Sequence, residues 1–201
     1  MRKEVILLAI SPNKITKKKE EIILSAVKIM NEKGHQRATM EEIAAELQMT
    51  KGSLYYYFRN KEDLIFRCHE LVLEQAIDEL REAFHSNVSN EVRLRQMIAI
   101  HVKYAVKEKE SFNMIIKPDE TFSTDHLHPI LKKRNEYEGW FDRVILAGIE
   151  CGEFNINEPK IVRMMLLGAL NWIQQWYKKA GDKSLEELQQ IYSDYLLKVM
   201  K

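Results

Sequence analysis

Glycine and proline are scarce in this chain, which holds 7 Gly and 4 Pro among 201 residues. That scarcity excludes collagen-like and low-complexity disordered chains, which are rich in both residues. Long stretches of Lys, Glu, Leu and Ile favour helices instead. With 45% hydrophobic and 30% charged residues, the composition predicts a soluble, all-α protein of one or two domains with a substantial core.

Cysteine is also rare. Cys68 and Cys151 lie far apart in helical-looking segments, which argues against a disulfide framework and fits a reducing cytoplasm. No apolar run approaches the ~20 residues that a membrane-spanning helix needs. The opening segment MRKEVILLAI has a basic start and a short apolar run but no A-x-A-like cleavage site, so we interpret residues 1–15 as an N-terminal arm. We therefore expect a cytoplasmic protein without a membrane partner.

Motifs of catalysis and metal binding are missing from the sequence. None of the six histidines stands in a metal-ligand pattern such as H-E-x-x-H, and there is no Gly-rich phosphate loop and no G-x-S-x-G. Asp125, His126 and His128 offer a surface metal site, but such a cluster is more often a solvated loop. The sequence therefore predicts a protein that is not an enzyme and has no metal and no cofactor.

What the chain does have is an uneven distribution of charge. Residues 1–61 hold 12 Lys/Arg and 7 Asp/Glu, a net charge of +5, whereas residues 62–201 carry a net charge of −4. A basic first third on an acidic remainder indicates a segment that faces nucleic acid, attached to a body with another role. A chance fluctuation would produce the same asymmetry, so the inference needs further signals.

Helix signals in this basic third describe a helix-turn-helix. Apolar residues at helical spacing predict a first helix over 16–33, and Gly34 is a natural stop. Thr39, followed three residues later by Glu42, forms a capping box that opens a short second helix. Thr50 is a natural N-cap for a short third helix. Two short helices across a tight turn, following a longer helix, make a helix-turn-helix arrangement.

The third helix carries three consecutive tyrosines in the stretch TKGSLYYYF. Leu54 and Phe58 are four residues apart, so they share one helix face and enter the core together. Successive residues turn by ~100°, so the tyrosines fan around the rest of the helix and face solvent or a partner. A tyrosine offers a ring to a thymine methyl group and a hydroxyl to a phosphate oxygen. Lys51, Gly52 and Ser53 lie at the helix end that reaches base edges in this motif.

The segment 19–66 resembles the DNA-binding domain of TetR-type transcriptional repressors. The resemblance rests on the stretches IILSAVKIMNEKG, ATMEEIAAELQMTKGSLYYYF and RNKEDL. It implies phosphate contacts and base contacts from separate residues. The implied phosphate contacts are Thr39, Thr50, Tyr56, Tyr57 and Lys61, and the implied base contacts are Lys51, Gly52, Ser53 and Tyr55. Many relatives carry His at the position of Tyr57, so this chain has a hydroxyl there and lacks a potential positive charge.

The remainder of the chain is expected to form a second, helical domain. The predicted organisation is an arm over 1–15, a DNA-binding domain over 16–61 and a ligand-binding and dimerisation domain over 62–201. Helices of the last domain are expected over 91–109, 111–116, 127–152, 158–180 and 184–200. Pro159 suits a first helical turn, and Ser184 with Glu187 forms another capping box.

The helix expected over 158–180 is apolar nearly all round, with the sequence IVRMMLLGALNWIQQWY, so it must be buried on more than one side. One side would face the domain interior and the other a second subunit. The resemblance implies the same arrangement, because TetR-type proteins dimerise through the last two helices of each protomer. We therefore predict a homodimer on a palindromic double-stranded DNA operator. The predicted interface residues are Leu166, Leu170, Tyr192, Leu196 and Val199.

The resemblance also implies that the second domain binds a small molecule that releases the operator. The bulky residues expected to line an apolar cavity are Phe112, Trp140, Phe141, Val144, Met165, Trp172, Trp176 and Tyr177, although each of them is as readily ordinary core. The stretch LLGALNWIQQWYKKAGDKSLEEL resembles TetR-type regulators of fatty-acid and sterol degradation, whose ligands are acyl-CoA thioesters. Related chains often carry Arg where this chain has Gln175. We expect an acyl-CoA effector, with an unrelated hydrophobic small molecule of the multidrug type as the alternative.

A helical interaction module without DNA binding is the competing interpretation of the whole chain. It leaves the three tyrosines and the basic first third unexplained. The sequence therefore favours a TetR-type repressor.

Overall fold

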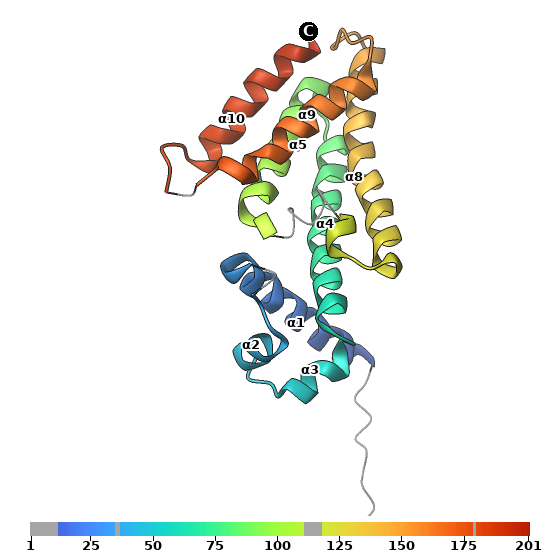
Figure 1. The fold of residues 1–201 in the computed structure, drawn as a ribbon. Helices are drawn as coiled ribbons and strands as arrows, with labels where there is room; N and C mark the ends of the chain where they lie inside the picture. Colours follow the sequence, from blue (N-terminus) through green and yellow to red (C-terminus); the bar gives the residue numbers. More distant parts are fainter. Residues whose placement is uncertain (1–11, 35–36, 111–117, 179) are drawn as a thin grey trace, which may run out of the picture. The chain divides into compact units, whose positions relative to one another are not determined.

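The computed structural model describes residues 12–34, 37–110, 118–178 and 180–201 (Figure 1). Within these ranges every regular element is a helix and no strand is present, which agrees with the predicted all-α class. None of the helices described is long and apolar enough to cross a bilayer. The chain divides into two compact units, Met1–Cys68 and His69–Lys201. The predicted boundary between residues 61 and 62 stays a prediction.

The first unit contains α1 (Pro12–Lys33), α2 (Met40–Glu46), α3 (Lys51–Tyr57) and the first turns of α4 (Lys61–His85). α1 begins four residues before the predicted start, with a proline in its first turn, where the missing N–H is tolerated. α1 is followed by Gly34, whose φ of 86° lies in the left-handed region that glycine adopts without strain. The Gly34 N–H donates to the carbonyl of Met30 at 2.8 Å, so the predicted stop is confirmed.

Side-chain caps and one unusual backbone residue shape the turn between α2 and α3. Thr39 and Glu42 form the predicted capping box: the Thr39 hydroxyl accepts from the Glu42 N–H at 3.2 Å, and Glu42 Oε2 accepts from the Thr39 N–H at 3.0 Å. Gln48 has a φ of 53°, which a non-glycine residue adopts in tight turns. Thr50 then caps α3 by accepting from the Ser53 N–H at 3.1 Å.

The core of the first unit draws on all four helices. Leu54 and Phe58 are buried, Tyr55 and Tyr56 are exposed and Tyr57 is half-buried, which confirms the argument from periodicity. The other buried hydrophobic residues of this unit are Ile22, Ala26, Val27, Ile29, Met30, Ala38, Met40, Ile43, Ala44, Leu64, Ile65, Phe66 and Cys68. This packing leaves one side of α3 free of the core.

The second unit contains the rest of α4 together with α5 (Asn90–Lys107), α7 (Pro118–Thr121), α8 (Thr124–Glu150), α9 (Pro159–Trp176), α10 (Leu185–Leu196) and a 3-10 turn, η1 (Leu197–Met200). α5 is the central helix, because it packs against α8, α9 and α10. The short helix predicted over 111–116 lies outside the described residues. α9 ends at Trp176, before the predicted residue 180, and the chain turns where the Gly181 N–H donates to the Lys178 carbonyl at 2.8 Å.

Gly148 allows the loop after α8 to fold back onto that helix. Phe154 is buried against Gly148, and a Cβ added at this glycine would lie 2.1 Å from Phe154 Cδ2. Real Cβ atoms do not approach a ring that closely, so a larger residue at position 148 would displace Phe154.

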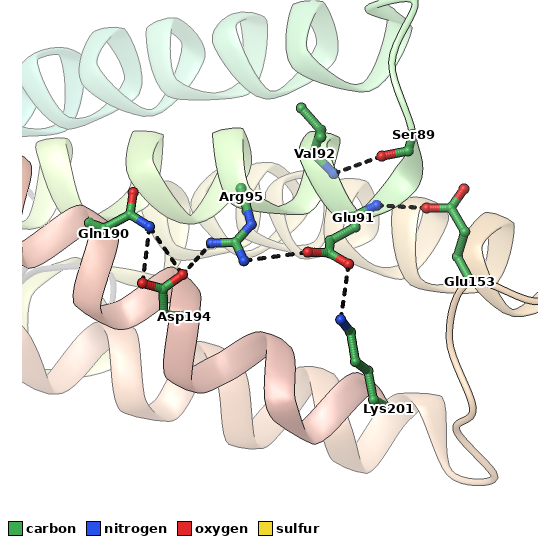
Figure 2. A network of polar contacts seen from close by, with 8 residues as sticks. All are labelled: Ser89, Glu91, Val92, Arg95, Glu153, Gln190, Asp194 and Lys201. Carbon is green, nitrogen blue, oxygen red and sulfur yellow. Dashed lines mark hydrogen bonds and ion pairs between the residues drawn. The ribbon is translucent and has the colours of Figure 1, made fainter.

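α10 and the C-terminus are joined to α5 by a network of ion pairs (Figure 2). Arg95 Nη1 lies 2.6 Å from Asp194 Oδ1, and Arg95 Nη2 lies 3.3 Å from Glu91 Oε1. The other Glu91 oxygen lies 3.4 Å from Lys201 Nζ, and the Glu91 N–H donates to Glu153 Oε2 at 2.9 Å. Because these side chains are partly exposed, the network fixes the position of α10 more than it adds stability.

Candidate nucleic-acid interface and effector-binding domain

The outward side of α3 carries most of the residues predicted to contact DNA. Lys51, Gly52 and Ser53 are exposed at its N-terminal end, and Tyr56 is 67% exposed. The rings of Tyr56 and Tyr57 meet edge to face, with centroids 5.1 Å apart. This contact holds two neighbouring hydroxyls on a polar and aromatic surface, which suits contacts to a DNA backbone.

Lys51 is held in place from two sides. Its ammonium forms an ion pair with the carboxylate of Glu41 on α2, and it lies 5.8 Å from the ring centroid of Tyr55. The hydrogen bond with Lys51 lowers the pKa of Glu41, and the same bond raises the pKa of Lys51. A residue expected to read bases therefore carries a neutralising partner when DNA is absent.

The threonines expected to bind phosphates already make local hydrogen bonds. Both the N–H and the hydroxyl of Thr39 are engaged with Glu42 in the capping box. The Thr50 hydroxyl accepts from the Ser53 N–H and lies 2.8 Å from Ser53 Oγ. Lys61 lies in the first turn of α4 and is half-buried. A phosphate contact from Thr39 would share or replace the capping box, whereas Thr50 needs only a change in the direction of its hydroxyl proton.

The second unit has a polar cluster in its interior. On α5, His101 is buried, and its Nδ1 lies 3.0 Å from the hydroxyl of Tyr137 on α8. Burial lowers the pKa of His101 to about 3, against the opposing effect of a side-chain hydrogen bond with Asn171 on α9. Burial likewise raises the pKa of Tyr137 well above its ordinary value. Three helices thus contribute uncharged polar groups to one region of the core.

Trp140 is a second buried aromatic residue of this unit with unusual surroundings. The Arg143 guanidinium lies 4.2 Å from its ring centroid and that of Arg81 lies 5.9 Å away. Its indole N–H has no hydrogen-bond partner in the described part of the chain. In the same part, no group of three or more His, Cys, Asp or Glu side chains is arranged to hold a metal ion.

The outward side of α9 carries exposed apolar side chains along most of its length, interrupted by the exposed Gln175. Trp172 is 66% exposed, and Gly168, one turn before it, has no atom within 4 Å of an added Cβ. The remaining exposed large hydrophobic residues of this face are Ile161, Met164, Met165 and Trp176. On α10 and η1, Ile191, Tyr195 and Val199 are also exposed. We call these residues of α9, α10 and η1, with Gly168, the α9–α10 apolar face.

Family models match both units of the chain. The model described as bacterial regulatory proteins of the tetR family matches residues 22–68, and the model of a tetracyclin repressor-like C-terminal domain matches residues 87–200. The second match alone spans more than half of the sequence. The chain belongs to the TetR family.

Known proteins resemble this TetR-family chain over most of its length. The fatty acid metabolism regulator protein of Bacillus subtilis is 24% identical over 156 residues, which are 75% of this chain and 78% of that protein. A TetR/AcrR-family transcriptional regulator from Thermobifida fusca is 23% identical and superposes with a TM-score of 0.78 over 92% of this chain and 99% of the other. AibR, crystallised with isovaleryl coenzyme A and operator DNA, is 20% identical with a TM-score of 0.75 over 91% and 98%. The Thermobifida fusca regulator and AibR therefore share the fold of this chain.

The family membership makes the chain a transcriptional regulator, and the helix-turn-helix of α2 and α3 is its DNA-binding motif. The role of each individual residue on DNA stays a prediction. Lys51, Ser53 and the tyrosines lie on α3 and Thr50 caps it, whereas Thr39 caps α2.

Two of the predicted interface residues lie inside the protomer. Leu166 is 1% exposed and Leu170 is fully buried, and their contact with a second subunit stays a prediction. α9 has two apolar stripes, and the stripe that contains these leucines packs against the protomer interior. Tyr192 and Leu196 are half-buried, and of the five predicted residues only Val199 belongs to the α9–α10 apolar face.

The predicted ligand-binding residues separate into three groups. Trp140, Phe141 and Val144 are buried as expected, and their contact with a ligand stays a prediction. Met165, Trp172 and Trp176 have exposed side chains in the protomer, and their contact with a ligand also stays a prediction. Tyr177 is half-buried, and its hydroxyl donates to the Lys183 carbonyl at 3.2 Å. Phe112 lies outside the described residues.

The sequence interpretation missed the polar cluster of His101, Tyr137 and Asn171 and their neighbour Gln174. A signal was present for Gln174. It follows Leu167 by seven residues and Leu170 by four, so it continues a buried apolar stripe of α9 with a polar residue.

Proposed function

We propose that this TetR-family regulator represses transcription as a homodimer on a palindromic operator and is released by an acyl-CoA. The observation that carries the proposal is the outward surface of α3, where exposed lysine, serine and tyrosine side chains stand on a helix whose opposite side is buried. In a helix-turn-helix this helix enters the major groove. Lys51, Gly52, Ser53 and Tyr55 would face base edges, and Thr50, Tyr56, Tyr57 and Lys61 would hold the phosphates.

The α9–α10 apolar face supports the dimer. A water-exposed row of methionine, isoleucine and tryptophan side chains is unfavourable for a monomer and marks an interaction surface. Gly168 lies within the row, where a glycine inside a helix lowers stability by about 1 kcal/mol relative to alanine. A glycine at this position would allow a close approach of α9 from the second subunit. Trp172 and Trp176, first expected at a ligand, are accordingly assigned to this interface, together with Val199.

Two-fold symmetry of the dimer would place two α3 helices on successive major grooves. The operator would then be a palindrome whose half-site centres lie about one helical turn, or a multiple of it, apart. The net charge of +5 on the first 61 residues supports the placement of this segment against DNA. That segment would supply most of the sequence-independent attraction to DNA.

The effector is proposed from the resemblance and from two of the comparisons. One similar protein is named a fatty acid metabolism regulator, and AibR was crystallised with isovaleryl coenzyme A and operator DNA. An acyl chain among the buried residues of α5 and α8 would gain roughly 0.8 kcal/mol per methylene buried, before the cost of ordering the chain. To act as an inducer, the acyl-CoA must bind better to a conformation that no longer fits the operator. An unrelated hydrophobic molecule is the alternative effector.

Selection of bound fragments from genomic DNA tests the DNA-binding part of the proposal. The expected result is an inverted repeat, protected symmetrically in a footprint and bound by two protomers in sedimentation experiments. A synthetic duplex that carries one half-site is the matched control, and it should bind far more weakly. Equal binding of the single half-site by one protomer would contradict the homodimer and the palindrome.

A further inference from the structure

Gln174 is a buried amide without a hydrogen bond. Its side chain is 1% exposed, and neither Nε2 nor Oε1 has a hydrogen-bond partner among the residues that the structure describes. A buried amide that makes no hydrogen bond loses its interactions with water and gains nothing in exchange. An apolar residue of similar size, such as methionine, would avoid that loss. The amide therefore does not serve protomer stability, which leaves binding of a ligand as its role.

The polar residues around Gln174 belong to the cluster in the core of the second unit. Asn171 precedes Gln174 by three residues on α9, so the two side chains lie on the same side of the helix. Asn171 is close enough to His101 on α5 to raise the pKa of that imidazole, and His101 Nδ1 lies 3.0 Å from the Tyr137 hydroxyl on α8. Leu167 and Leu170, on the same side of α9, are buried. The amide of Gln174 therefore extends a polar strip within an apolar interior.

This strip carries no net charge. His101 is neutral near pH 7, since burial holds its pKa at about 3, and Tyr137 keeps its proton. The carboxylate of Glu79, which raises the pKa of Tyr137, forms an ion pair with Lys103 and accepts a hydrogen bond from the Tyr104 hydroxyl at 2.8 Å. Among the described residues, the strip thus offers hydrogen bonds but no free charge to balance an ionised ligand.

We infer that Gln174 donates a hydrogen bond to an uncharged carbonyl of the effector, the class that includes thioesters, esters, amides and ketones. The inference rests on the proposed function, because it places the effector in the second unit. A carbonyl oxygen would satisfy the amide N–H at little cost in desolvation. A carboxylate in the same place would leave water without a counter-charge, which is strongly unfavourable. Gln174 is therefore a residue that selects the acyl thioester over the free acid.

Calorimetric titration of the full chain without DNA tests this inference. The probes are the decanoyl thioester of N-acetylcysteamine, which is uncharged, and decanoate. The unaltered protein should bind the thioester at least about tenfold more tightly than decanoate. Gln174→Met should weaken thioester binding about tenfold, leave decanoate unchanged and raise the unfolding temperature. Gln75→Met, the same substitution at an exposed glutamine of α4, should change neither probe.

Gln174→Asn provides a second variant, because it keeps the amide but withdraws it by one methylene, and it should also lose affinity for the thioester. Three results would overturn the inference: no binding of the thioester, equal binding of the two probes, or unchanged thioester affinity in Gln174→Met. Failure of the proposed function looks different. If the thioester binds as expected but no acyl-CoA releases the operator, the proposed induction fails while the role of Gln174 stands.

Discussion

The carboxylate of Glu41 on α2 forms an ion pair with the ammonium of Lys51, the first residue of α3. Both side chains are more than half exposed, so the pair contributes little to folding. The ion pair matters instead for DNA binding. A lysine already paired with a carboxylate has to give up that partner, or share it, before it binds a base edge or a phosphate.

Glu41→Gln should therefore strengthen binding to the operator. The variant removes a negative charge that competes with DNA for the Lys51 ammonium, so the plot of log K against log salt should also steepen. Glu46→Gln is the matched control, because it removes the same charge from α2 at an exposed residue that pairs with no cation among the described residues. Equal effects of the two variants would mean that net charge, not the ion pair, controls the affinity.

Lys61 and Ser53 should respond differently to substitution. Lys61→Ala should weaken binding to all sequences and lower the salt dependence by about one phosphate equivalent. Ser53→Ala should change the preferred base at one or two operator positions, with a smaller change in affinity for random DNA. Binding to an operator library at several salt concentrations measures both effects. A uniform loss from both variants would contradict the separation into base contacts and phosphate contacts.

Gly168 offers a sharp test of the dimer interface. An added Cβ meets no atom within 4 Å there, so Gly168→Leu should leave the protomer folded while it keeps a partner helix at a distance. Sedimentation should then show a dimer dissociation constant raised at least about a hundredfold, because a leucine side chain fills space that two closely packed helices share. Gly168→Ala is the control, and it should raise protomer stability by up to about 1 kcal/mol. A fully dimeric Gly168→Leu protein would place the interface elsewhere.

Acid should destabilise the second unit through His101. Its pKa is about 3 in the folded chain and about 6.5 in an unfolded chain, so below pH 6.5 the unfolded chain binds the extra proton. The contribution of His101 to stability is therefore fully present above pH 6.5 and falls by about 1.4 kcal/mol per pH unit until about pH 3. Between pH 6 and 4.5 the unaltered protein should lose about 2 kcal/mol more than His101→Gln in urea denaturation. Parallel losses in the two proteins would show that other groups dominate.

Local signals in the sequence were sufficient for much of the DNA-binding unit. The capping box of Thr39 and the stop at Gly34 depend only on residues a few positions apart, and both are present, as is the capping box of Ser184 in the second unit. The outward direction of Tyr55 and Tyr56 follows from the four-residue spacing of Leu54 and Phe58, because a helix fixes the angle between them.

The sequence could not decide which side of α9 faces inward. Leu166 and Leu170 form one apolar stripe, and Met164, Met165 and Trp172 lie on another, so periodicity alone allows either to be buried. The choice depends on α5 and α8, which complete the core on the leucine side. The polar cluster of His101 and Tyr137 was hidden for the same reason, because it forms only when residues 36 positions apart come together.

The most direct test of the proposed function is a titration of acyl-CoAs of increasing chain length into the complex of the protein with its selected operator, followed by fluorescence anisotropy of labelled DNA. The account predicts release that strengthens with chain length up to a limit set by the interior of the second unit, with coenzyme A alone inactive. Release that is independent of chain length, or an operator complex that no acyl-CoA dissociates, would contradict it.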